Sequence, residues 1–327
     1  MQAGKKTVTV LGCGVSGLTT AICLQRAGYE VEIVTRELSP FTTSDKAAAI
    51  WFPFAAGPAD KVEQWSRDTY LEFEKLSKNP DSGVYLVELF LLAEDVNELE
   101  PGWSLSLPSS SWRVAEPAEL PAGYETAFAI KIPLIETPIY LPFLVSRFQE
   151  SGGTIHMRTV TCLEGLREPG RLVVNCAGLE ARTLTVDAEL YPIKGNIITG
   201  KIQGDEPWLR CLVDDAGENR LAYVLPRKRT GDIILGGTAM EHDDSPEFGP
   251  SEVSGIYERC LKLIPELKDL PVISMDAGLR PGRKEIRLGW DAELKGLIHN
   301  YGHGGSGFTV AWGCGRAVLE LIEKAGA

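Results

Sequence analysis

The chain has 327 residues, of which 44% are hydrophobic and 24% charged, and its formal net charge is −12. This length suggests about two domains, and the composition excludes a disordered or fibrous protein. The negative charge argues against binding to a nucleic-acid backbone, and the longest apolar run, 47–56, covers only about half a membrane span. Neither nucleic acid nor membrane is therefore predicted as a partner.

Cysteine and histidine usage points to a reducing compartment and to no metal ion. The seven cysteines are scattered, odd in number and without a CxxC pair, and only four histidines are present. This pattern is typical of reduced thiols rather than of a disulfide framework or a zinc site. Lys5 and Lys6 run straight into an apparent strand instead of a signal core, so a cytoplasmic location is predicted.

The first predicted unit reads as strand, helix and strand. Residues 7–11 form a buried apolar run, 14–27 have a helical pattern that ends before Gly28, and 30–35 form a second apolar run. A right-handed crossover makes the two strands parallel.

Later segments continue the pattern in chain order. Periodicity predicts helices at 62–76, 139–151, 252–263 and 308–324. It predicts strands at 84–90, 154–160, 172–176, 285–288 and 296–299. Between 189 and 237 the sequence is rich in β signals, with a hairpin turn at 228–231. The pattern indicates two interleaved domains, one α/β and discontinuous and the other a mixed β-sheet.

A glycine motif joins the first strand to the first helix. Residues 12–17, GCGVSG, match G-x-G-x-x-G in the strand–turn–helix context that gives the motif meaning. The first glycine makes the turn, the second lets a pyrophosphate approach and the third lets helix and strand pack. The phosphate would lie at the positive helix end. The predicted contacts are Gly12, Gly14, Val15, Ser16 and Gly17, and the alternative is a turn that binds nothing.

The end of the second strand carries the groups expected near an adenosine. The acidic residue is Glu37, a little later than the usual position for a ribose contact. Arg36 could pack on adenine or meet a phosphate. A solvated strand end is the alternative for both residues.

A second glycine loop, GHGGSG at 302–307, precedes the last predicted helix. The first motif does not choose between NAD(P) and FAD, but a nicotinamide enzyme has no evident use for a second strand–glycine–helix unit. A helix N-terminus aimed at the N1–C2=O edge of a flavin would stabilise the negative charge that grows on reduction. FAD is therefore the predicted cofactor, and a crowded sheet-edge turn is the alternative.

Seven segments then carry a family resemblance: VTVLGCGVSGL, TTSDKAAAIWFP, VVNCAGLEA, PIKGNI, AYVLPR, GLRPGRKEIRLGW and HNYGHGGSGFTVAWG. Along almost its whole length the chain resembles the family of D-amino acid oxidases and D-aspartate oxidases. The short segment 208–223 is more typical of microbial than of animal members. The resemblance implies a Rossmann-like FAD-binding domain at 1–58, 133–188 and 272–327, and a substrate-binding domain at 59–132 and 189–271.

The resemblance also implies an activity. FAD would be bound non-covalently, and a D-amino acid would lose a hydride from Cα to flavin N5. The imino acid would hydrolyse to a 2-oxo acid and ammonia, and O2 would become hydrogen peroxide. The expected partners are therefore a small-molecule D-amino acid and O2. The sequence does not determine the oligomeric state, and a homodimer is one option.

Site roles follow from the resemblance, residue by residue. Arg280 matches the arginine that binds the substrate carboxylate. Tyr223 matches the tyrosine that hydrogen-bonds the same carboxylate, and Gly305 matches the glycine whose carbonyl accepts a hydrogen bond from the substrate amine. An arginine fork fits a carboxylate bidentately, whereas lysine does not. Arg283 competes for this role from the residue pattern alone. The further cofactor contacts implied are Thr42, Thr43, Ser44, Ala48, Ala49, Val160, Ala177, Gly304, Gly307, Phe308 and Thr309.

Substrate size is expected to depend on an apolar wall. By the resemblance, Ile50, Phe52 and Phe54 face the side-chain pocket, which favours neutral D-amino acids over D-aspartate. Arg220 or Arg227 could supply a second cation and reverse that preference. Hydride transfer needs no dedicated general base, so His303 is expected to be a hydrogen-bonded loop residue.

Three positions depart from the family pattern. Asn219 stands where some members carry a lid tyrosine, Asn196 where a glutamine is usual, and Ala49 where a glycine is often found. Ala49 is therefore expected to crowd flavin N5. The competing functions are a glycine or sarcosine oxidase, an NAD(P)-dependent dehydrogenase and a flavoprotein without turnover.

Overall fold

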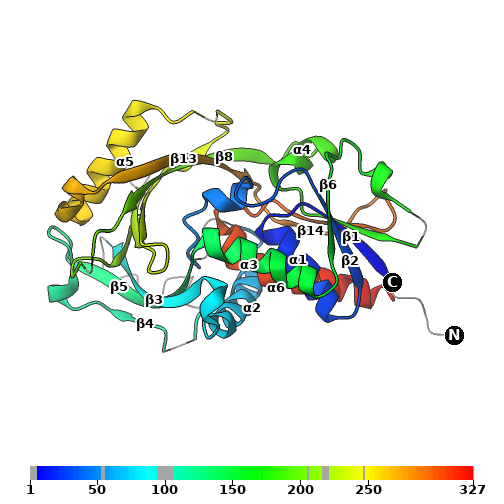
Figure 1. The fold of residues 1–327 in the computed structure, drawn as a ribbon, viewed down its shortest axis with the longest axis horizontal. Coiled ribbons are helices and arrows are strands. Elements are labelled where there is room, and N and C mark those ends of the chain that lie inside the picture. The colour runs from blue at the N-terminus through cyan, green and yellow to red at the C-terminus, as the bar shows by residue number, and fades with distance from the viewer. Residues whose placement is uncertain are drawn as a thin grey trace.

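The computed structural model describes residues 6–52, 56–93, 106–108, 110–168, 170–204, 206–215, 221–245 and 247–326. Their strands form two sheets at opposite ends of an elongated molecule, with helices packed between and beside them (Figure 1). This is the predicted α/β architecture with mixed sheets.

The six-stranded sheet is the α/β half of the molecule. Its order is β14 (Arg287–Trp290), β15 (Leu297–Tyr301), β7 (Leu172–Asn175), β1 (Thr7–Leu11), β2 (Glu30–Thr35) and β6 (Thr154–Met157). All neighbours are parallel except β14, which runs antiparallel to β15. The chain leaves β1 toward β2 on one side and returns to β7 on the other. A crevice at such a switch point is where open α/β sheets bind ligands.

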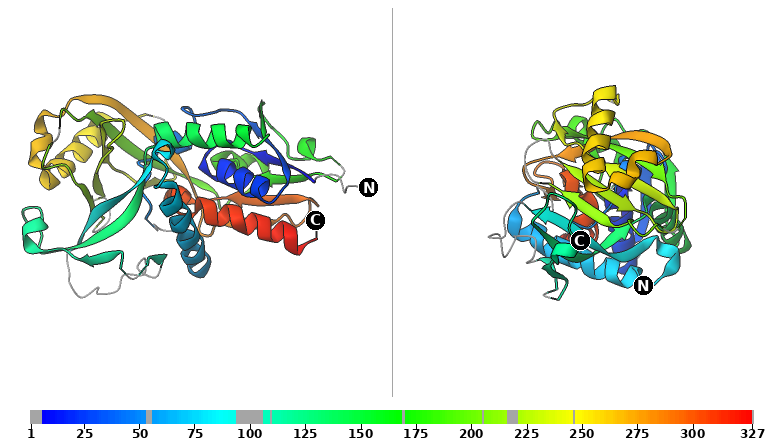
Figure 2. Two further views of the ribbon diagram at one scale, coloured as in Figure 1. Left: turned by 60° about the horizontal axis from the view of Figure 1, so that its bottom comes forward. Right: turned by 90° about the vertical axis from the view of Figure 1, so that its left-hand side faces the viewer.

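Helices cover one face of this sheet. They are α1 (Val15–Arg26), α3 (Thr137–Glu150) and α6 (Gly307–Lys324), with α2 (Ala59–Leu76) against α6. Figure 2 shows α2 crossing close to the red α6. Gly313 permits this approach, because a Cβ there would run into the Trp65 backbone, and its amide donates to Thr69 Oγ1 at 2.9 Å. A short helix, α4 (Ala181–Leu184), follows β7.

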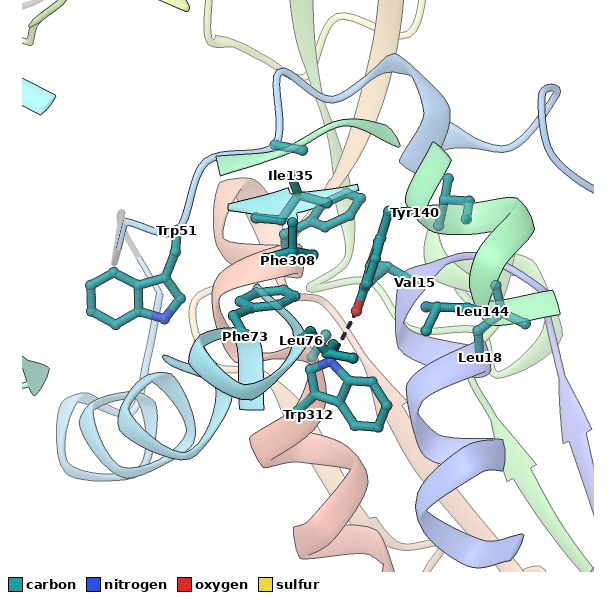
Figure 3. Close-up of a cluster of buried hydrophobic side chains, with 14 of the residues drawn as sticks. Val15, Leu18, Trp51, Phe73, Leu76, Ile135, Tyr140, Leu144, Phe308 and Trp312 are labelled. Atoms are coloured by element: carbon teal, nitrogen blue, oxygen red, sulfur yellow. Dashed lines mark hydrogen bonds between the residues drawn. The ribbon is translucent and has the colours of Figure 1, made fainter. Parts of the chain in front are cut away.

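The main core lies where α1, α3, α2 and α6 meet (Figure 3). Trp312 is 1% exposed, and its indole Nε1 donates to the Tyr140 hydroxyl at 2.9 Å. Phe73 packs edge-on against Tyr140, with ring centroids 5.7 Å apart. Such pairs stabilise beyond the area they bury, and the bond satisfies both buried polar groups. Phe308 continues this core to the glycine loop, so the start of α6 is firmly supported.

The nine-stranded sheet forms the other half. Its order is β12 (Met240–Glu241), β8 (Tyr191–Lys201), β11 (Asp232–Gly236), β10 (Ala222–Pro226), β9 (Cys211–Asp214), β3 (Val84–Ala93), β5 (Thr126–Ile135) and β4 (Trp112–Val114), and β13 (Val272–Gly282) pairs with β8. Helix α5 (Pro250–Leu263) packs on one face against Ala222 and Val224. Tyr223 and Leu225 alternate to the opposite face, as a strand requires.

Most predicted elements are present, with shifts of a few residues at their ends. The strand predicted at 285–288 is present with a shift of two residues, since β14 runs from Arg287 to Trp290. In the sheets, β13 belongs with β8, although the predicted division counted 272–282 with the cofactor domain. The described helices include none with the length and hydropathy to cross a bilayer.

Candidate cofactor and substrate site

A cavity of about 260 Å³ lies at the carboxyl ends of β1, β2 and β7. Its walls join segments far apart in sequence: the first glycine motif, the loop after β2, the loop after β7 and the second glycine loop. The predicted cofactor residues among them are Gly12, Gly14, Val15, Ser16, Arg36, Glu37, Thr42, Thr43, Ser44, Val160, Ala177, Gly304, Gly307 and Phe308, together with Gly305.

At the first glycine motif, neighbouring atoms lie so close to the backbone that side chains would not fit, as the binding of a pyrophosphate against the backbone requires. Gly12 has φ of +105°, and a Cβ there would lie 2.5 Å from the Cys176 carbonyl oxygen. A Cβ on Gly14 would lie 2.9 Å from Ser44 Oγ. Gly17 lines neither cavity of the site. A Cβ on it would collide with the Gly12 carbonyl, so its part is to let helix and strand pack.

Two helix ends face this cavity without capping side chains. Neither α1 nor α6 has a side-chain cap or an acidic residue in its first turn. At α1 the Val15 amide donates to Ser44 Oγ at 3.0 Å. The remaining amides of each first turn and the helix dipole favour anionic groups at both places. These features fit an elongated cofactor with a phosphate group near α1 and an electron-rich ring near α6.

The far end of the cavity is charged. Arg36 forms ion pairs with Glu180 at 3.0 Å and with Glu37 at 3.3 Å, and all three line the cavity. Arg158 and Thr159 also line it. The sequence interpretation did not include Glu180, Arg158 or Thr159, because no local motif marks them.

A second cavity, of about 400 Å³, adjoins the first and shares Ala47, Arg280, Gly304, Gly305 and Phe308 with it. Tyr223, Ile50 and Phe52 line this second cavity. The structure therefore brings the three predicted catalytic residues, Arg280, Tyr223 and Gly305, to one place beside the glycine loop. Phe54 and Asn219 lie outside the described residues.

Glycines make room for the side chains of Arg280 and Tyr223. A Cβ on Gly195 in β8 would overlap the Arg280 guanidinium, and a Cβ on Gly236 or Gly237 would overlap the Tyr223 ring. The Arg280 guanidinium donates from Nη1 to the Thr238 carbonyl at 2.9 Å. Sequence reasoning missed these glycines, although a glycine inside a strand signals close approach of another group. The available signals were the Gly195 of PIKGNI and the paired glycines that end β11.

Tyr223 is set up to remain a hydrogen-bond donor. It is 8% exposed, and burial raises its pKa, although the nearby Arg280 lowers it in part. Among the described residues no carboxylate lies within ion-pair distance of Arg280, so its charge faces the cavity without a protein counter-ion.

The rest of the second cavity is mostly apolar. Besides Ile50 and Phe52, its apolar wall consists of Leu89, Ile193, Val213, Leu221, Leu225 and Ala239. Charged residues gather at the rim, where Lys284, Asp215 and Glu241 are exposed.

Arg227 does not supply a second cation to this cavity. Its guanidinium is buried and donates from Nη2 to the carbonyls of Ala47 at 3.2 Å and Ala48 at 3.4 Å. Burial lowers its pKa. Arg227 therefore fastens the loop before Ile50, and Arg220 lies outside the described residues.

That loop contains the predicted contacts Ala48 and Ala49, which line the second cavity and not the first. Ala49 is 6% exposed and has φ of +59°, in the left-handed region that favours glycine. Thr309 lines neither cavity. It ties the start of α6 to this loop, because its hydroxyl donates to the Phe52 carbonyl at 2.8 Å and accepts from the Phe52 amide at 3.1 Å.

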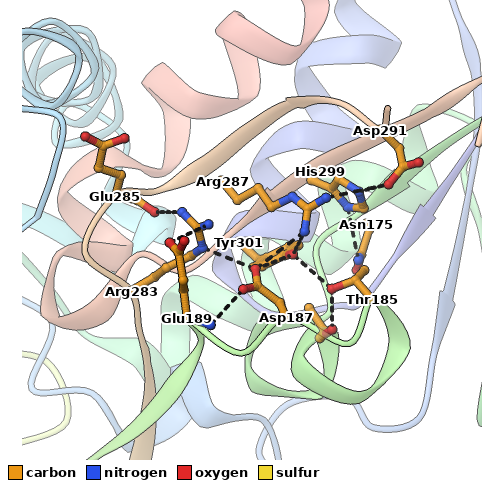
Figure 4. Close-up of polar contacts among 11 residues, drawn as sticks. Asn175, Thr185, Asp187, Glu189, Arg283, Glu285, Arg287, Asp291, His299 and Tyr301 are labelled. Atoms are coloured by element: carbon orange, nitrogen blue, oxygen red, sulfur yellow. Dashed lines mark hydrogen bonds and ion pairs between the residues drawn. The ribbon is translucent and has the colours of Figure 1, made fainter. Parts of the chain in front are cut away.

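Arg283 belongs to a polar network beside the cavity (Figure 4). Its Nε lies 3.1 Å from Asp187 Oδ2, and Nη2 lies 2.8 Å from Glu189. Tyr301 donates to the same Asp187 oxygen at 2.9 Å. Burial alone would raise the pKa of Asp187, but the Tyr301 bond, a backbone amide and Arg283 lower it. Although Arg283 borders the second cavity, its charge is already paired, unlike that of Arg280.

His303 is a buried loop residue beside the first cavity. It is 4% exposed, and its Nε2 lies 2.9 Å from the Asn300 side-chain oxygen. Burial lowers its pKa to about 4, so the ring is neutral at physiological pH. A hydrogen-bonded role agrees with this geometry. Across the described residues, histidine, cysteine and acidic side chains form no group of three or more that could hold a metal ion.

Comparison with known proteins gives a consistent result. Residues 7–321 match the family model described as FAD dependent oxidoreductase. The chain is 40% identical to a D-amino-acid oxidase of Rubrobacter xylanophilus, covering 97% of this chain and 95% of that protein. It is 38% identical to a D-amino-acid oxidase of Streptomyces coelicolor, covering 97% and 96%.

Solved structures share the fold at lower identity. Glycine oxidase from Bacillus cereus superposes with a TM-score of 0.81 at 20% identity, over 98% of both chains. L-alpha-glycerophosphate oxidase from Mycoplasma pneumoniae, solved with FAD bound, has a TM-score of 0.77 at 16% identity, over 98% and 95%. With two glycine loops on one crevice and a family match over nearly its whole length, the chain belongs to the FAD-dependent oxidoreductases and is an enzyme that uses FAD.

Proposed function

We propose that the enzyme oxidises D-amino acids with neutral, apolar side chains to 2-oxo acids and ammonia. The observation that carries this proposal is the second cavity, where Arg280, Tyr223 and Gly305 meet an apolar wall beside the glycine loop. The D-amino-acid oxidases to which the chain is similar support the handedness.

The carboxylate of the substrate would be held by two groups of this chain. Arg280 offers a fork of donors, and Tyr223 remains protonated because burial raises its pKa. The Gly305 carbonyl would accept from the substrate amine, which must be unprotonated for oxidation. These anchors fix the Cα hydrogen in one direction, which is the orientation effect that such a reaction needs.

When bound, FAD would supply the redox chemistry, as an acceptor for the hydride that leaves Cα, with O2 as the final oxidant and hydrogen peroxide as its product. The two glycine loops and Ser44 would hold it. The neutral His303 is not required as a base, and the imino product hydrolyses in water.

The wall supports the neutral substrate class. A D-aspartate side chain would place an unpaired carboxylate against Ile50, Phe52 and Leu225, which is costly without a cation. Arg227 cannot pair with it, because it is buried under Ala47 and Ala48. The exposed Lys284 at the rim is too solvated to provide comparable selectivity.

The test is an anaerobic visible spectrum of the purified enzyme with D-methionine, L-methionine and D-aspartate in separate cuvettes. Bleaching of the flavin bands by D-methionine alone, or far faster than by D-aspartate, is the expected result. Faster bleaching by D-aspartate would overturn the substrate class and keep the reaction. If no D-amino acid bleaches the flavin, the oxidase function is wrong.

A further inference from the structure

The two proposed carboxylate anchors meet at the open end of the β10–β11 hairpin. Tyr223 lies on β10, opposite Gly236 on β11. Thr238 follows two residues after Gly236. Its carbonyl accepts a hydrogen bond from Arg280 at 2.9 Å, and its hydroxyl accepts one from the backbone amide of Asn196 at 2.9 Å. The chain that leaves β11 therefore sets the position of Arg280, while β10 sets that of Tyr223.

One arginine from the opposite face holds both strand ends. Arg259 lies on α5, which is labelled in Figure 1 and packs against Ala222 and Val224, whereas the alternate residues Tyr223 and Leu225 line the second cavity. Its Nε donates to the Leu221 carbonyl at 3.1 Å, and its Nη2 donates to the Gly237 carbonyl at 2.8 Å. Leu221 comes two residues before Tyr223, and Gly237 comes directly before Thr238.

The Arg259 guanidinium is committed to these two carbonyls. Among the described residues no carboxylate lies within ion-pair distance of it, so an ion pair does not explain its position. One turn earlier in α5, Gly255 leaves space for it, because a Cβ there would lie 3.2 Å from Arg259 Nη1. A planar fork can bond two diverging carbonyls at once, whereas an ammonium group lacks that geometry.

We propose that Arg259 is a positioning residue for substrate binding: it clamps the strand ends that carry Tyr223 and, through Thr238, Arg280. The inference rests on the proposed function, because it assumes that these two side chains bind the substrate carboxylate. Loss of the clamp would let the anchors separate, while the first glycine motif and Ser44, which make no contact with Arg259, would keep their places in the cofactor cavity.

The experiment compares holoenzymes carrying Arg259→Met, Arg259→Lys and the control Lys262→Met, an exposed position on the same helix. Binding of benzoate, a carboxylate that cannot be oxidised, is measured from the change it causes in the flavin spectrum. We expect Arg259→Met to raise the benzoate Kd and the KM for D-methionine by about tenfold or more, with kcat reduced less. Arg259→Lys should lie between, and FAD affinity should not change.

The outcomes distinguish a positioning role of Arg259, a structural role of Arg259 and a failure of the proposed function, for which Arg280→Met is measured alongside. If folded Arg259→Met or Arg259→Lys enzyme keeps benzoate Kd and KM within about twofold of the parent, the proposal is wrong, even where the melting temperature falls. If Arg259→Met does not fold, Arg259→Lys provides the same test; should it also fail to fold, Arg259 serves the fold and the proposal is rejected. Should Arg280→Met leave benzoate binding intact, the proposed function fails instead.

Discussion

At the scale of single residues, Arg280 is distinguished by the absence of a protein counter-ion among the described residues. Replacing it with methionine keeps an unbranched apolar stem but removes the charged guanidinium, so an anionic ligand would lose about 2–5 kcal/mol of binding free energy. Lysine should recover only part of this, because it cannot bond bidentately. The measurements are benzoate Kd and kcat/KM, with Arg182→Met, an exposed arginine of α4, as control. Equal values for Arg280→Lys and the parent would contradict the bidentate role.

The backbone conformation of Ala49 determines how substitutions there change the stability of the protein. Its φ of +59° strains any L side chain, and a β-branched one most of all. Glycine relieves this strain but loses a buried methyl group, so Ala49→Gly should change the unfolding free energy by less than about 1 kcal/mol. Ala49→Val should lose about 2 kcal/mol or more. Thermal unfolding of the apoprotein checks both, and a valine variant as stable as the glycine variant would show that the strain is absent.

At the scale of elements, the turn into α1 depends on missing side chains. Gly14→Ala would put a methyl group 2.9 Å from Ser44 Oγ, which must shift from the Val15 amide. We expect the FAD Kd to rise about tenfold or more, while the apoprotein stays folded. The matched control is Gly165→Ala, at an exposed glycine where an added Cβ meets nothing within 4 Å. An unchanged Kd in Gly14→Ala would mean that the cofactor does not approach this turn closely.

Local signals predicted most elements because their patterns are short-range. The unit 7–35 and the helix that ends at Lys324 could be predicted, since continuous apolar strand runs, helical periodicity and glycine signals lie within each segment. The placement of β13 beside β8 could not be predicted, because neither segment contains a local sequence signal for pairing with a strand so far away in the chain. The same limit applies to the site. The resemblance supplied Arg280 and Tyr223, but the glycines that accommodate them and the Arg259 clamp depend on tertiary contacts.

At the scale of the whole molecule, stability should fall in two stages as the pH is lowered. Burial lowers the pKa of His303 from 6.5 to about 4, so the unfolded chain takes up its proton first. Unfolding is therefore favoured progressively from about pH 6.5 to 4, by about 3 kcal/mol for this group. Below about pH 4, protonation of carboxylates lowers the stability further. Asp187 and Asp291 have lowered pKa values in the fold, Asp291 about 2, so the stability that they contribute is lost as the pH falls from about 4 toward 2.

His303→Gln separates the two stages. The amide can still bond to Asn300 but does not titrate, so unfolding measured by denaturant between pH 6.5 and 4.5 should show a flatter dependence than the parent. His299 contributes in the same direction, because burial lowers its pKa despite the opposing effect of Asp291, so some slope should remain. Below pH 4 the two proteins should lose stability in parallel, since both keep Asp187 and Asp291. If the unfolding free energies of the parent and His303→Gln instead change in parallel over the whole pH range, His303 is not held neutral in the fold. The first loss of stability must then come from other groups.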